Sequence, residues 1–247
     1  MRTVTVIGIG PGNPEQVTIE AIRALNAADL VLIPRKGAAR DDLAGLRREI
    51  CARYLDNPAT RLVEFDMPVR DAAGDYRAGV DAWHRAIAAT YRRLLDAEPP
   101  DAAVALLVWG DPSLYDSTLR ILDHLAAGGL AFSRRVVPGI TSLQALAAAH
   151  RIPLNAIGGP VHVTTGRRLA AAVPDAETIA VMLDGELAFR DLPGDAWTIW
   201  WAAYLGMPGE IAIAGPLDAV ADRIAEAREA ARKAHGWIMD TYLLRRR

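Results

Sequence analysis

The sequence predicts an α/β protein with two domains. Strand-like and helix-like segments alternate along residues 1–152, and several of the strand-like runs end abruptly in glycine-rich turns. After Ile152-Pro153 the pattern changes, because strand-like runs follow one another without full helices between them. Alternation is typical of a parallel sheet with helices on both faces. We therefore expect an N-terminal α/β domain over residues 1–152 and a C-terminal α/β domain over residues 153–247.

The N-terminal part contains five strand-like segments, of which Val104–Val108 is a continuous apolar run. Short, continuous apolar runs are typical of strands that are buried on both faces of a parallel sheet. The expected strands are Val4–Ile9, Leu30–Ile33, Arg61–Phe65, Val104–Trp109 and Arg135–Val137. The expected helices are Pro14–Ala27, Asp41–Leu55, Tyr76–Ala97, Ser113–Ala127 and Ser142–His150. This order predicts a five-stranded, mainly parallel sheet with flanking helices.

The C-terminal part has more strands than helices, and this composition predicts a second, mixed sheet. The expected strands are Val161–Thr164, Thr178–Leu183, Ala196–Leu205, Glu210–Ala214 and Trp237–Leu244. A short helix is expected over Arg167–Ala172 and a long one over Leu217–His235. Trp197, Trp200 and Trp201 are expected to lie in the core or at a subunit interface, as large aromatic side chains commonly do.

Composition and charge exclude several classes of protein. Apolar residues make up 51% of the 247 residues, which is enough for a sizeable core, and the net charge of −2 offers no basic field for nucleic acid. The single cysteine, Cys51, cannot form an intramolecular disulfide. No apolar run approaches the roughly 18 residues of a membrane span, and the N-terminus shows no signal-peptide pattern. We expect a cytoplasmic protein without nucleic-acid or membrane partners.

Three glycine-containing turns follow predicted strands and mark the candidate ligand site. They are Gly8-Ile9-Gly10-Pro11-Gly12, Gly110-Asp111-Pro112 and Pro138-Gly139-Ile140-Thr141-Ser142. In open parallel sheets, ligands bind outside the carboxyl ends of the strands, where such turns lie. Each turn also has a plain structural reading: the first could be a tight strand-to-helix turn, Asp111 could cap the following helix, and Thr141-Ser142 could be an N-cap pair.

Other ligand classes fit these turns poorly. The third glycine of a dinucleotide-binding motif is replaced by Asn13, and Pro11 removes a backbone donor, so a dinucleotide oxidoreductase is disfavoured. The sequence has no phosphate-binding P-loop and no serine-hydrolase elbow. Its five histidines do not stand at metal-ligand spacing, so no metal is expected.

The three turns, together with Val17-Thr18, resemble the tetrapyrrole methylase family. The resemblance covers nearly the whole chain in order. It implies methyl transfer from S-adenosylmethionine (SAM), bound in a cleft between two α/β domains, to a tetrapyrrole carbon, with S-adenosylhomocysteine as product. Members of the family are typically homodimers. One departure is that relatives more often have Gly-Gly-Asp where this chain has Trp109 before Gly110, so cofactor contact there is expected through the backbone or reshaped by the indole.

Three further stretches, Trp109–Leu122, His162–Leu169 and Gly236–Arg247, resemble the deacetylating members of the family. Those members methylate carbon 1 of precorrin-5 in aerobic cobalamin biosynthesis and release a two-carbon unit as acetate. Two alternatives remain open: a sister C-methyltransferase that acts at another macrocycle carbon, and a non-catalytic module that binds SAM or a tetrapyrrole.

The resemblance also implies site residues. The expected cofactor-binding residues are Pro11, Trp109, Gly110, Asp111, Leu114, Thr141, Ser142, Met182, Leu183, Leu205 and Gly206. Proton transfer during acyl loss has three candidates, Asp111, Tyr115 and Asp184, among which the sequence does not choose. The basic candidates for holding the substrate carboxylates are Arg35, Lys36, Arg167 and Arg168, and an equally good reading makes them solvated loop charges.

Overall fold

A computed structural model describes residues 1–35, 41–70 and 75–247, and these form two compact units. The first unit comprises residues 1–10 and 14–140, and the second comprises residues 11–13 and 141–247. The sequence places the boundary after residue 152. The difference is helix α5 (Ser142–His150), which packs on strands β8, β9 and β10 of the second unit and therefore belongs to it.

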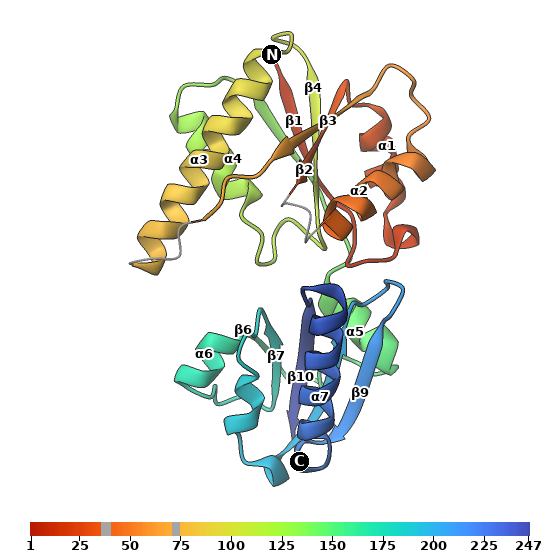
Figure 1. Ribbon diagram of the computed structural model, residues 1–247, viewed down its shortest axis with the longest axis vertical. Helices are drawn as coiled ribbons and strands as arrows, with labels where there is room; N and C mark the ends of the chain where they lie inside the picture. The colour runs from red at the N-terminus through yellow and green to blue at the C-terminus, as the bar shows by residue number, and fades with distance from the viewer. Residues whose placement is uncertain (36–40, 71–74) are drawn as a thin grey trace. The chain divides into compact units, whose positions relative to one another are not determined.

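The first unit is a parallel sheet between two layers of helices (Figure 1). Its described strands are β1 (Thr3–Gly8), β2 (Leu30–Arg35), β3 (Arg61–Asp66), β4 (Ala103–Val108) and β5 (Ser133–Val137). They stand in the order β3-β2-β4-β1-β5, and every neighbouring pair is parallel. Helices α1 (Ile19–Asn26) and α2 (Asp41–Tyr54) cover one face, and α3 (Tyr76–Asp96) and α4 (Thr118–Ala127) cover the other. The predicted five-stranded parallel sheet is confirmed.

Alternate residues of the central strands supply the two cores. Val4 and Val6 of β1 join the core under α3 and α4, whereas Ile7 and Ile9 join the core under α1 and α2. Successive side chains of a strand point to opposite faces of the sheet, so an apolar residue is needed at every position. This explains why the sequence of the central strand β4 is apolar throughout.

Two predicted helices begin later than the sequence indicates. The segment expected as Pro14–Ala27 is a short 3-10 turn, η1 (Pro14–Gln16), followed by α1, whose cap Thr18 accepts the Ala21 N–H at 3.1 Å. The segment expected as Ser113–Ala127 becomes helical only at Thr118, whose N–H donates to the Asp116 carboxylate at 2.7 Å. Residues 113–117 therefore form a loop.

The second unit is built on a mixed sheet, as predicted. Strands β6 (Val161–Thr165), β7 (Thr178–Met182), β8 (Trp197–Ala203), β9 (Ile211–Pro216) and β10 (Asp240–Arg246) stand in the order β6-β7-β10-β8-β9. Only β6 and β7 pair in parallel among the described strands of this sheet. Its other helical elements are α6 (Gly166–Ala171), η3 (Ala188–Asp191), η4 (Gly194–Ala196) and α7 (Leu217–His235). Trp197 and Trp201 are buried in its core.

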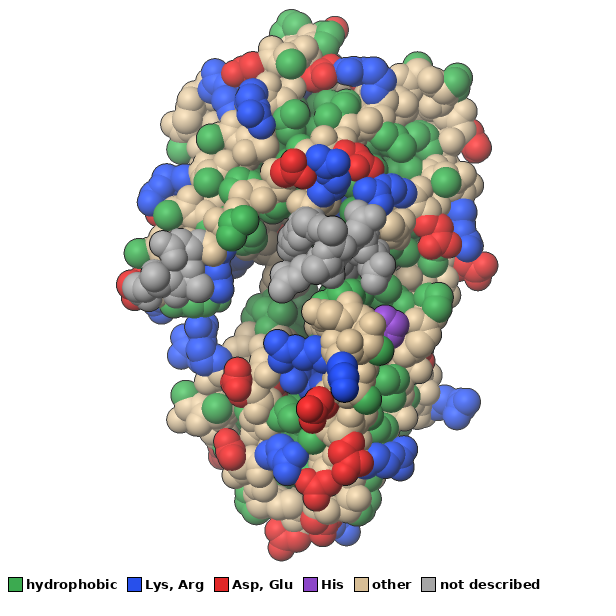
Figure 2. All heavy atoms as spheres, viewed as in Figure 1, with side chains coloured by type: hydrophobic (Ala, Val, Ile, Leu, Met, Phe, Trp, Pro, Cys, Tyr) green, Lys and Arg blue, Asp and Glu red, His purple; other side chains and the backbone are tan. Residues whose placement is uncertain are grey.

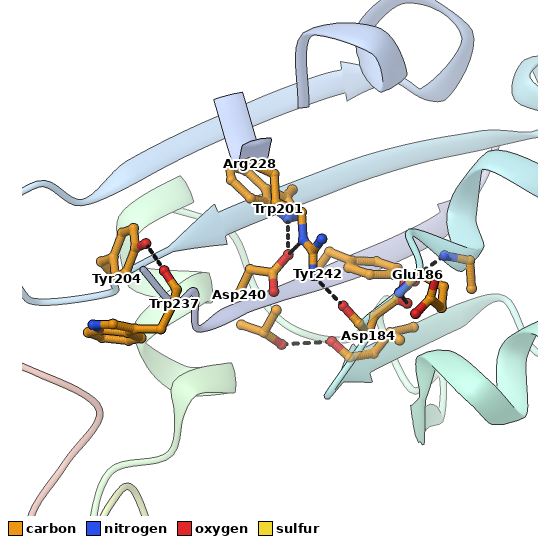
Figure 3. Close-up of polar contacts among 11 residues, drawn as sticks. Asp184, Glu186, Trp201, Tyr204, Arg228, Trp237, Asp240 and Tyr242 are labelled. Carbon is orange, nitrogen blue, oxygen red and sulfur yellow. Dashed lines mark hydrogen bonds and ion pairs between the residues drawn. The ribbon is translucent and has the colours of Figure 1, made fainter. Parts of the chain in front are cut away.

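A buried polar network ties the elements of the second unit together (Figure 3). The Asp240 carboxylate accepts hydrogen bonds from Arg228 Nε at 2.9 Å and from Trp201 Nε1 at 3.0 Å. Arg228 also donates to the Asp184 carbonyl at 2.8 Å, and the Asp184 carboxylate accepts the Tyr242 hydroxyl at 2.6 Å. Burial raises the pKa of Asp240, although Arg228 and Trp201 favour its charged form. The network links α7, β8, β10 and the loop after β7.

Replacing Arg228 with methionine is expected to destabilise the protein strongly. Both side chains of the Arg228–Asp240 ion pair are at least nine-tenths buried, and removal of one partner of such a pair typically costs about 3–5 kcal/mol. Denaturant unfolding of Arg228→Met measures this loss. Arg232→Met, an exposed position on the same helix, is the control; equal losses in the two variants would contradict the account.

Candidate functional site

The three predicted turns meet at one edge of the first unit's sheet, a feature that we call the three-turn junction. Gly10 and Gly110 exchange two backbone hydrogen bonds, with N···O distances of 3.3 and 2.8 Å. The Asp111 carboxylate accepts the Gly139 N–H at 2.8 Å. The turns follow β1, β4 and β5, which are neighbours in the sheet. The sheet order therefore brings together motifs that lie about a hundred residues apart in sequence.

The junction has no space for a side chain at Gly8 or at Gly139. A Cβ atom on Gly139 would lie 2.2 Å from the Gly110 carbonyl oxygen, and one on Gly8 would lie 2.6 Å from the Gly139 nitrogen. The obstructing atoms are backbone atoms, which cannot move aside as a flexible side chain could. Glycine is thus required here for close packing of backbone against backbone.

Asp111 holds the junction as an ionised carboxylate. One of its oxygens accepts both the Ser113 N–H, at 2.8 Å, and the Ser113 hydroxyl, while the other accepts Gly139. Burial by itself would raise the pKa of Asp111, but these hydrogen bonds outweigh it and lower the pKa below its ordinary value. The alternative role as cap of the next helix does not apply, because α4 begins only at Thr118. Proton transfer by Asp111 stays a prediction.

The other first-unit candidates surround the turn after β4. Trp109 is half-buried, and its indole N–H is buried without a hydrogen-bond partner among the described residues. The Leu114 N–H donates to the Asp111 carbonyl at 3.2 Å, so its backbone closes the same turn. Tyr115, a candidate for proton transfer, is 43% exposed and has a left-handed backbone with φ of 51°.

In the second unit, the loop that contains Pro11 packs against the loop that contains Leu205 and Gly206. A Cβ atom on the neighbouring Gly12 would lie 2.2 Å from the Leu205 carbonyl oxygen, so the two loops pack backbone to backbone. Leu205 is buried, and the Gly206 N–H donates to the Glu210 carboxylate at 2.7 Å. The structure thus groups three of the predicted cofactor residues.

Thr141 and Ser142 begin helix α5 and differ in their contacts. Thr141 forms a capping box with Gln144, whose side chain accepts the Thr141 N–H at 3.0 Å. The Ser142 hydroxyl is buried and has no hydrogen-bond partner among the described residues. Buried polar atoms are nearly always paired, so a hydroxyl without a protein partner is a candidate ligand contact.

The segment after β7 contains the remaining cofactor candidates and Asp184. Leu183 is 65% exposed and has a left-handed backbone with φ of 54°, a conformation that is uncommon for residues other than glycine. Met182 is half-buried at the end of the strand. The buried Asp184 carboxylate accepts the N–H groups of Glu186 and Ala188 in addition to the Tyr242 hydroxyl. Those bonds fit a structural role for Asp184 better than proton transfer, which stays a prediction.

The basic candidates are divided between the two units. Arg35, in the first unit, pairs with the Asp66 carboxylate at 2.9 Å. Arg167 and Arg168 are exposed on α6 of the second unit. Lys36 lies outside the described residues. The substrate-binding role of all four stays a prediction.

The sequence reasoning missed a cavity of the first unit that contains Arg47, Tyr91 and Asp116. A usable signal was present, because Arg47 stands three residues after Ala44 and four before Cys51, both of which are buried on α2. A charged residue on the apolar side of a helix is unusual and commonly serves a purpose beyond packing.

The comparison with protein families decides the assignment. The family model of the tetrapyrrole (corrin/porphyrin) methylases matches residues 3–221. The chain belongs to this family. The family resemblance inferred from the three turns is thereby confirmed, and the match includes the whole three-turn junction.

The similarity to individual tetrapyrrole methylases narrows the comparison further than the family model does. The chain is 53% identical to the precorrin-6A synthase (deacetylating) of Sinorhizobium sp., over 100% of this chain and 96% of the relative. It is 29% identical to a precorrin-2 C(20)-methyltransferase of Sinorhizobium sp., over 76% of this chain and 74% of that protein.

Solved structures confirm the two-unit fold. A cobalamin-synthesis-related protein, CobF of Corynebacterium diphtheriae, matches with a TM-score of 0.86 and 39% identity, covering 99% of this chain and 98% of that one. A uroporphyrin-III C-methyltransferase of Thermus thermophilus, complexed with S-adenosylhomocysteine, matches with a TM-score of 0.60 and 20% identity, covering 98% and 91%. The second likeness shows the fold alone.

Replacing Asp111 with asparagine is expected to reduce stability in a pH-dependent way. The folded-state pKa of Asp111 is lowered, so its contribution is present above the unfolded pKa and is lost as pH falls through the folded pKa. Hydrogen bonds to charged groups contribute about 1.5–3 kcal/mol, which is the expected difference from wild type at pH 7.

That difference should shrink as pH falls below about 4, the usual pKa of an unfolded aspartate. Denaturant unfolding at several pH values measures it, with Asp101→Asn, an exposed position, as the control. A difference that is independent of pH would contradict the ionised role of Asp111.

Proposed function

We propose that the protein is a precorrin-6A synthase (deacetylating), an S-adenosylmethionine-dependent C-methyltransferase of aerobic cobalamin biosynthesis. It methylates carbon 1 of precorrin-5 and releases the extruded two-carbon unit as acetate. The observation that carries this proposal is the 53% identity to a precorrin-6A synthase over 100% of this chain and 96% of that protein. The precorrin-2 C(20)-methyltransferase of Sinorhizobium sp. is only 29% identical, over 76% of this chain.

The described residues fit SAM as the methyl donor. Two buried donors that have no hydrogen-bond partner among the described residues, the Ser142 hydroxyl and the Trp109 indole N–H, lie in segments that the family resemblance assigns to cofactor binding. We assign contacts to Trp109, Gly110, Asp111 and Leu114 in the first unit. In the second unit we assign them to the residues Pro11, Thr141, Ser142, Met182, Leu183, Leu205 and Gly206. When bound, SAM supplies an electrophilic methyl group on a sulfonium, and S-adenosylhomocysteine is the product.

The chain's main task in methyl transfer is alignment. A reduced tetrapyrrole offers an electron-rich, enamine-like carbon, which needs no strong base to act as a nucleophile. Holding two reactants at the correct distance and orientation can lower the activation barrier of their reaction by about 7–11 kcal/mol. The rigid backbone packing at Gly8, Gly110 and Gly139 supports such alignment, because it leaves the turns little freedom to move.

We assign the substrate's carboxylates to Arg35, Arg167 and Arg168, with Lys36 as a further candidate, because planar guanidinium groups bind carboxylates in bidentate geometry. We also propose a cytoplasmic homodimer without nucleic-acid or membrane partners. None of the helices in the described ranges has the length and apolarity to cross a bilayer. Acidic and basic side chains are interspersed on the face drawn in Figure 2, which supports the absence of a nucleic-acid surface there.

Anaerobic incubation with precorrin-5 and methyl-labelled SAM tests the function. The expected result is label in the macrocycle together with one equivalent of free acetate. Label without acetate would assign the chain to a sister C-methyltransferase, and SAM binding without any transfer would indicate a binding module.

Replacing Ser142 with alanine is expected to weaken SAM binding without destabilising the protein. The hydroxyl makes no protein hydrogen bond among the described residues, and a net hydrogen bond of about 0.5–1.5 kcal/mol corresponds to about a 2- to 12-fold change in affinity. Titration calorimetry with SAM measures it.

The matched control is Ser133→Ala, whose hydroxyl is hydrogen-bonded to Thr3 Oγ1 at 2.8 Å. That variant should lose stability and keep its SAM affinity. The reverse pattern in the two variants would remove Ser142 from the cofactor site.

A further inference from the structure

The first unit contains a cavity of about 100 Å³ at the carboxyl ends of β2 and β4. None of the residues assigned above to SAM or to the substrate carboxylates lines it. The lining of the cavity combines three polar side chains, Arg47, Tyr91 and Asp116, with apolar side chains such as Met67, Trp83 and Ile121. We call this cavity the acyl pocket.

Arg47 places a fixed cation in the acyl pocket. Its Nε donates to the Leu107 carbonyl at 2.9 Å, so the guanidinium is anchored at the end of β4. Burial lowers the pKa of Arg47 to about 10, while the neighbouring Tyr91 and Asp116 oppose the shift. The guanidinium therefore stays charged at neutral pH, in surroundings where its interaction with a negative oxygen is strong.

Tyr91 and Asp116 supply a neutral donor and a carboxylate next to that cation. The Tyr91 ring packs edge-on against Phe65, with ring centroids 5.6 Å apart, and burial raises the pKa of its hydroxyl, which stays protonated. One oxygen of the Asp116 carboxylate accepts the Thr118 N–H at 2.7 Å, and this bond fixes its orientation at the start of α4.

The apolar residue Trp83 in the lining of the acyl pocket is also held in place by a hydrogen bond. The Trp83 indole N–H donates to the Pro68 carbonyl at 2.7 Å, so the ring cannot turn away. Because a water molecule occupies about 30 Å³, the cavity has room for about three waters, or for a two-carbon acyl group and one water. A small group that has both a polar oxygen and a methyl matches the size of the cavity and its mixed polar and apolar lining.

Building on the proposed function, we propose that the acyl pocket holds the two-carbon acyl group of the substrate during its removal and then the acetate product. The oxygen of a water molecule bonds to the acyl carbonyl carbon, and Asp116 takes the proton that this water loses. Arg47 and Tyr91 hold the carbonyl oxygen as it becomes negative.

Collapse of this adduct breaks the bond between the acyl carbon and the macrocycle carbon. The electron pair of that bond stays on the macrocycle carbon, which is the nucleophile that methyl transfer requires. The two-carbon unit leaves as acetic acid, which loses its proton to solvent, and Asp116 returns its own proton to solvent. Water supplies the additional oxygen of the acetate, so atoms and charge balance without an oxidant or reductant.

A carboxylate side chain of the macrocycle has the same chemistry as acetate and is the competing occupant. Single turnover with saturating precorrin-5 and methyl-labelled SAM separates the two, with acetate release and precorrin-5 affinity measured for each variant. Asp116→Asn should release acetate at least about 100-fold more slowly, the usual effect of losing a general base. Its SAM and precorrin-5 affinities should stay within about threefold of wild type.

The matched control is Asp123→Asn, an exposed residue on the same helix that pairs with Arg134, and it should release acetate as wild type does. Acetate release by Asp116→Asn at the wild-type rate would overturn the proposal. An Arg47→Gln variant that binds precorrin-5 weakly but releases acetate normally at saturation would also overturn it, in favour of the macrocycle side chain.

A second experiment tests the acyl pocket without precorrin-5 and without turnover. Saturation-transfer NMR on free wild-type protein should show binding of acetate but not of the larger benzoate, and the acetate signal should be lost in Arg47→Gln and retained in Asp123→Asn. Absence of acetate binding to wild type would overturn the acyl pocket even if the enzyme deacylates. Failure of wild type to release acetate from precorrin-5, with acetate binding intact, would instead contradict the proposed function.

Discussion

The site depends on one steric constraint: three glycine-containing turns pack so closely that backbone touches backbone. Gly10 bonds to Gly110, and the Asp111 carboxylate bonds to Gly139. No side chain fits at Gly8 or Gly139 without displacing backbone atoms. Because the turns follow three adjacent parallel strands, the register of the sheet is transmitted directly to the loops that follow them. A shift of one strand would separate the motifs.

The two units stabilise their functional loops by different means. In the first unit, glycine packing and one ionised carboxylate hold the turns. In the second, a buried network from Arg228 and Asp240 to Asp184 and Tyr242 fixes the loop after β7 (Figure 3). Asp184 is consequently occupied by structural hydrogen bonds, whereas Asp116 lines a cavity. A carboxylate that faces open space is the better candidate for handling a proton during acyl loss.

Much of the fold could be predicted from local sequence patterns. The five strands of the first unit and helix Leu217–His235 follow from apolar runs and helical periodicity, and the glycine turns follow from the special backbone that each requires. The loop over residues 113–117 could not be predicted, because its sequence has a helix-like pattern and α4 nevertheless begins only at Thr118, whose N–H donates to the Asp116 carboxylate. Long-range packing, such as that of α5 against β10, leaves no local signal either.

The residues of the site that stand in turn motifs could be predicted from the sequence, whereas those brought together by tertiary packing could not. Gly110, Asp111 and Gly139 stand in recognisable motifs, and the structure brings them together. Arg47 stands at helical spacing from the buried Ala44 and Cys51, which singles it out, but only the tertiary structure shows that Arg47 and Tyr91 line one cavity. That the Ser142 hydroxyl is buried and finds no hydrogen-bond partner in the described part of the chain is likewise visible only in the folded protein.

The most direct test of the central claim is the SAM affinity of Gly139→Ala, measured by calorimetry beside Gly45→Ala. A Cβ atom at residue 45 meets nothing within 4 Å, so that variant controls for the added methyl group. The account predicts wild-type affinity for Gly45→Ala. For Gly139→Ala it predicts retained secondary structure with SAM binding weakened at least about tenfold, which corresponds to about 1.4 kcal/mol. Wild-type affinity and unchanged thermal stability in Gly139→Ala would contradict the account.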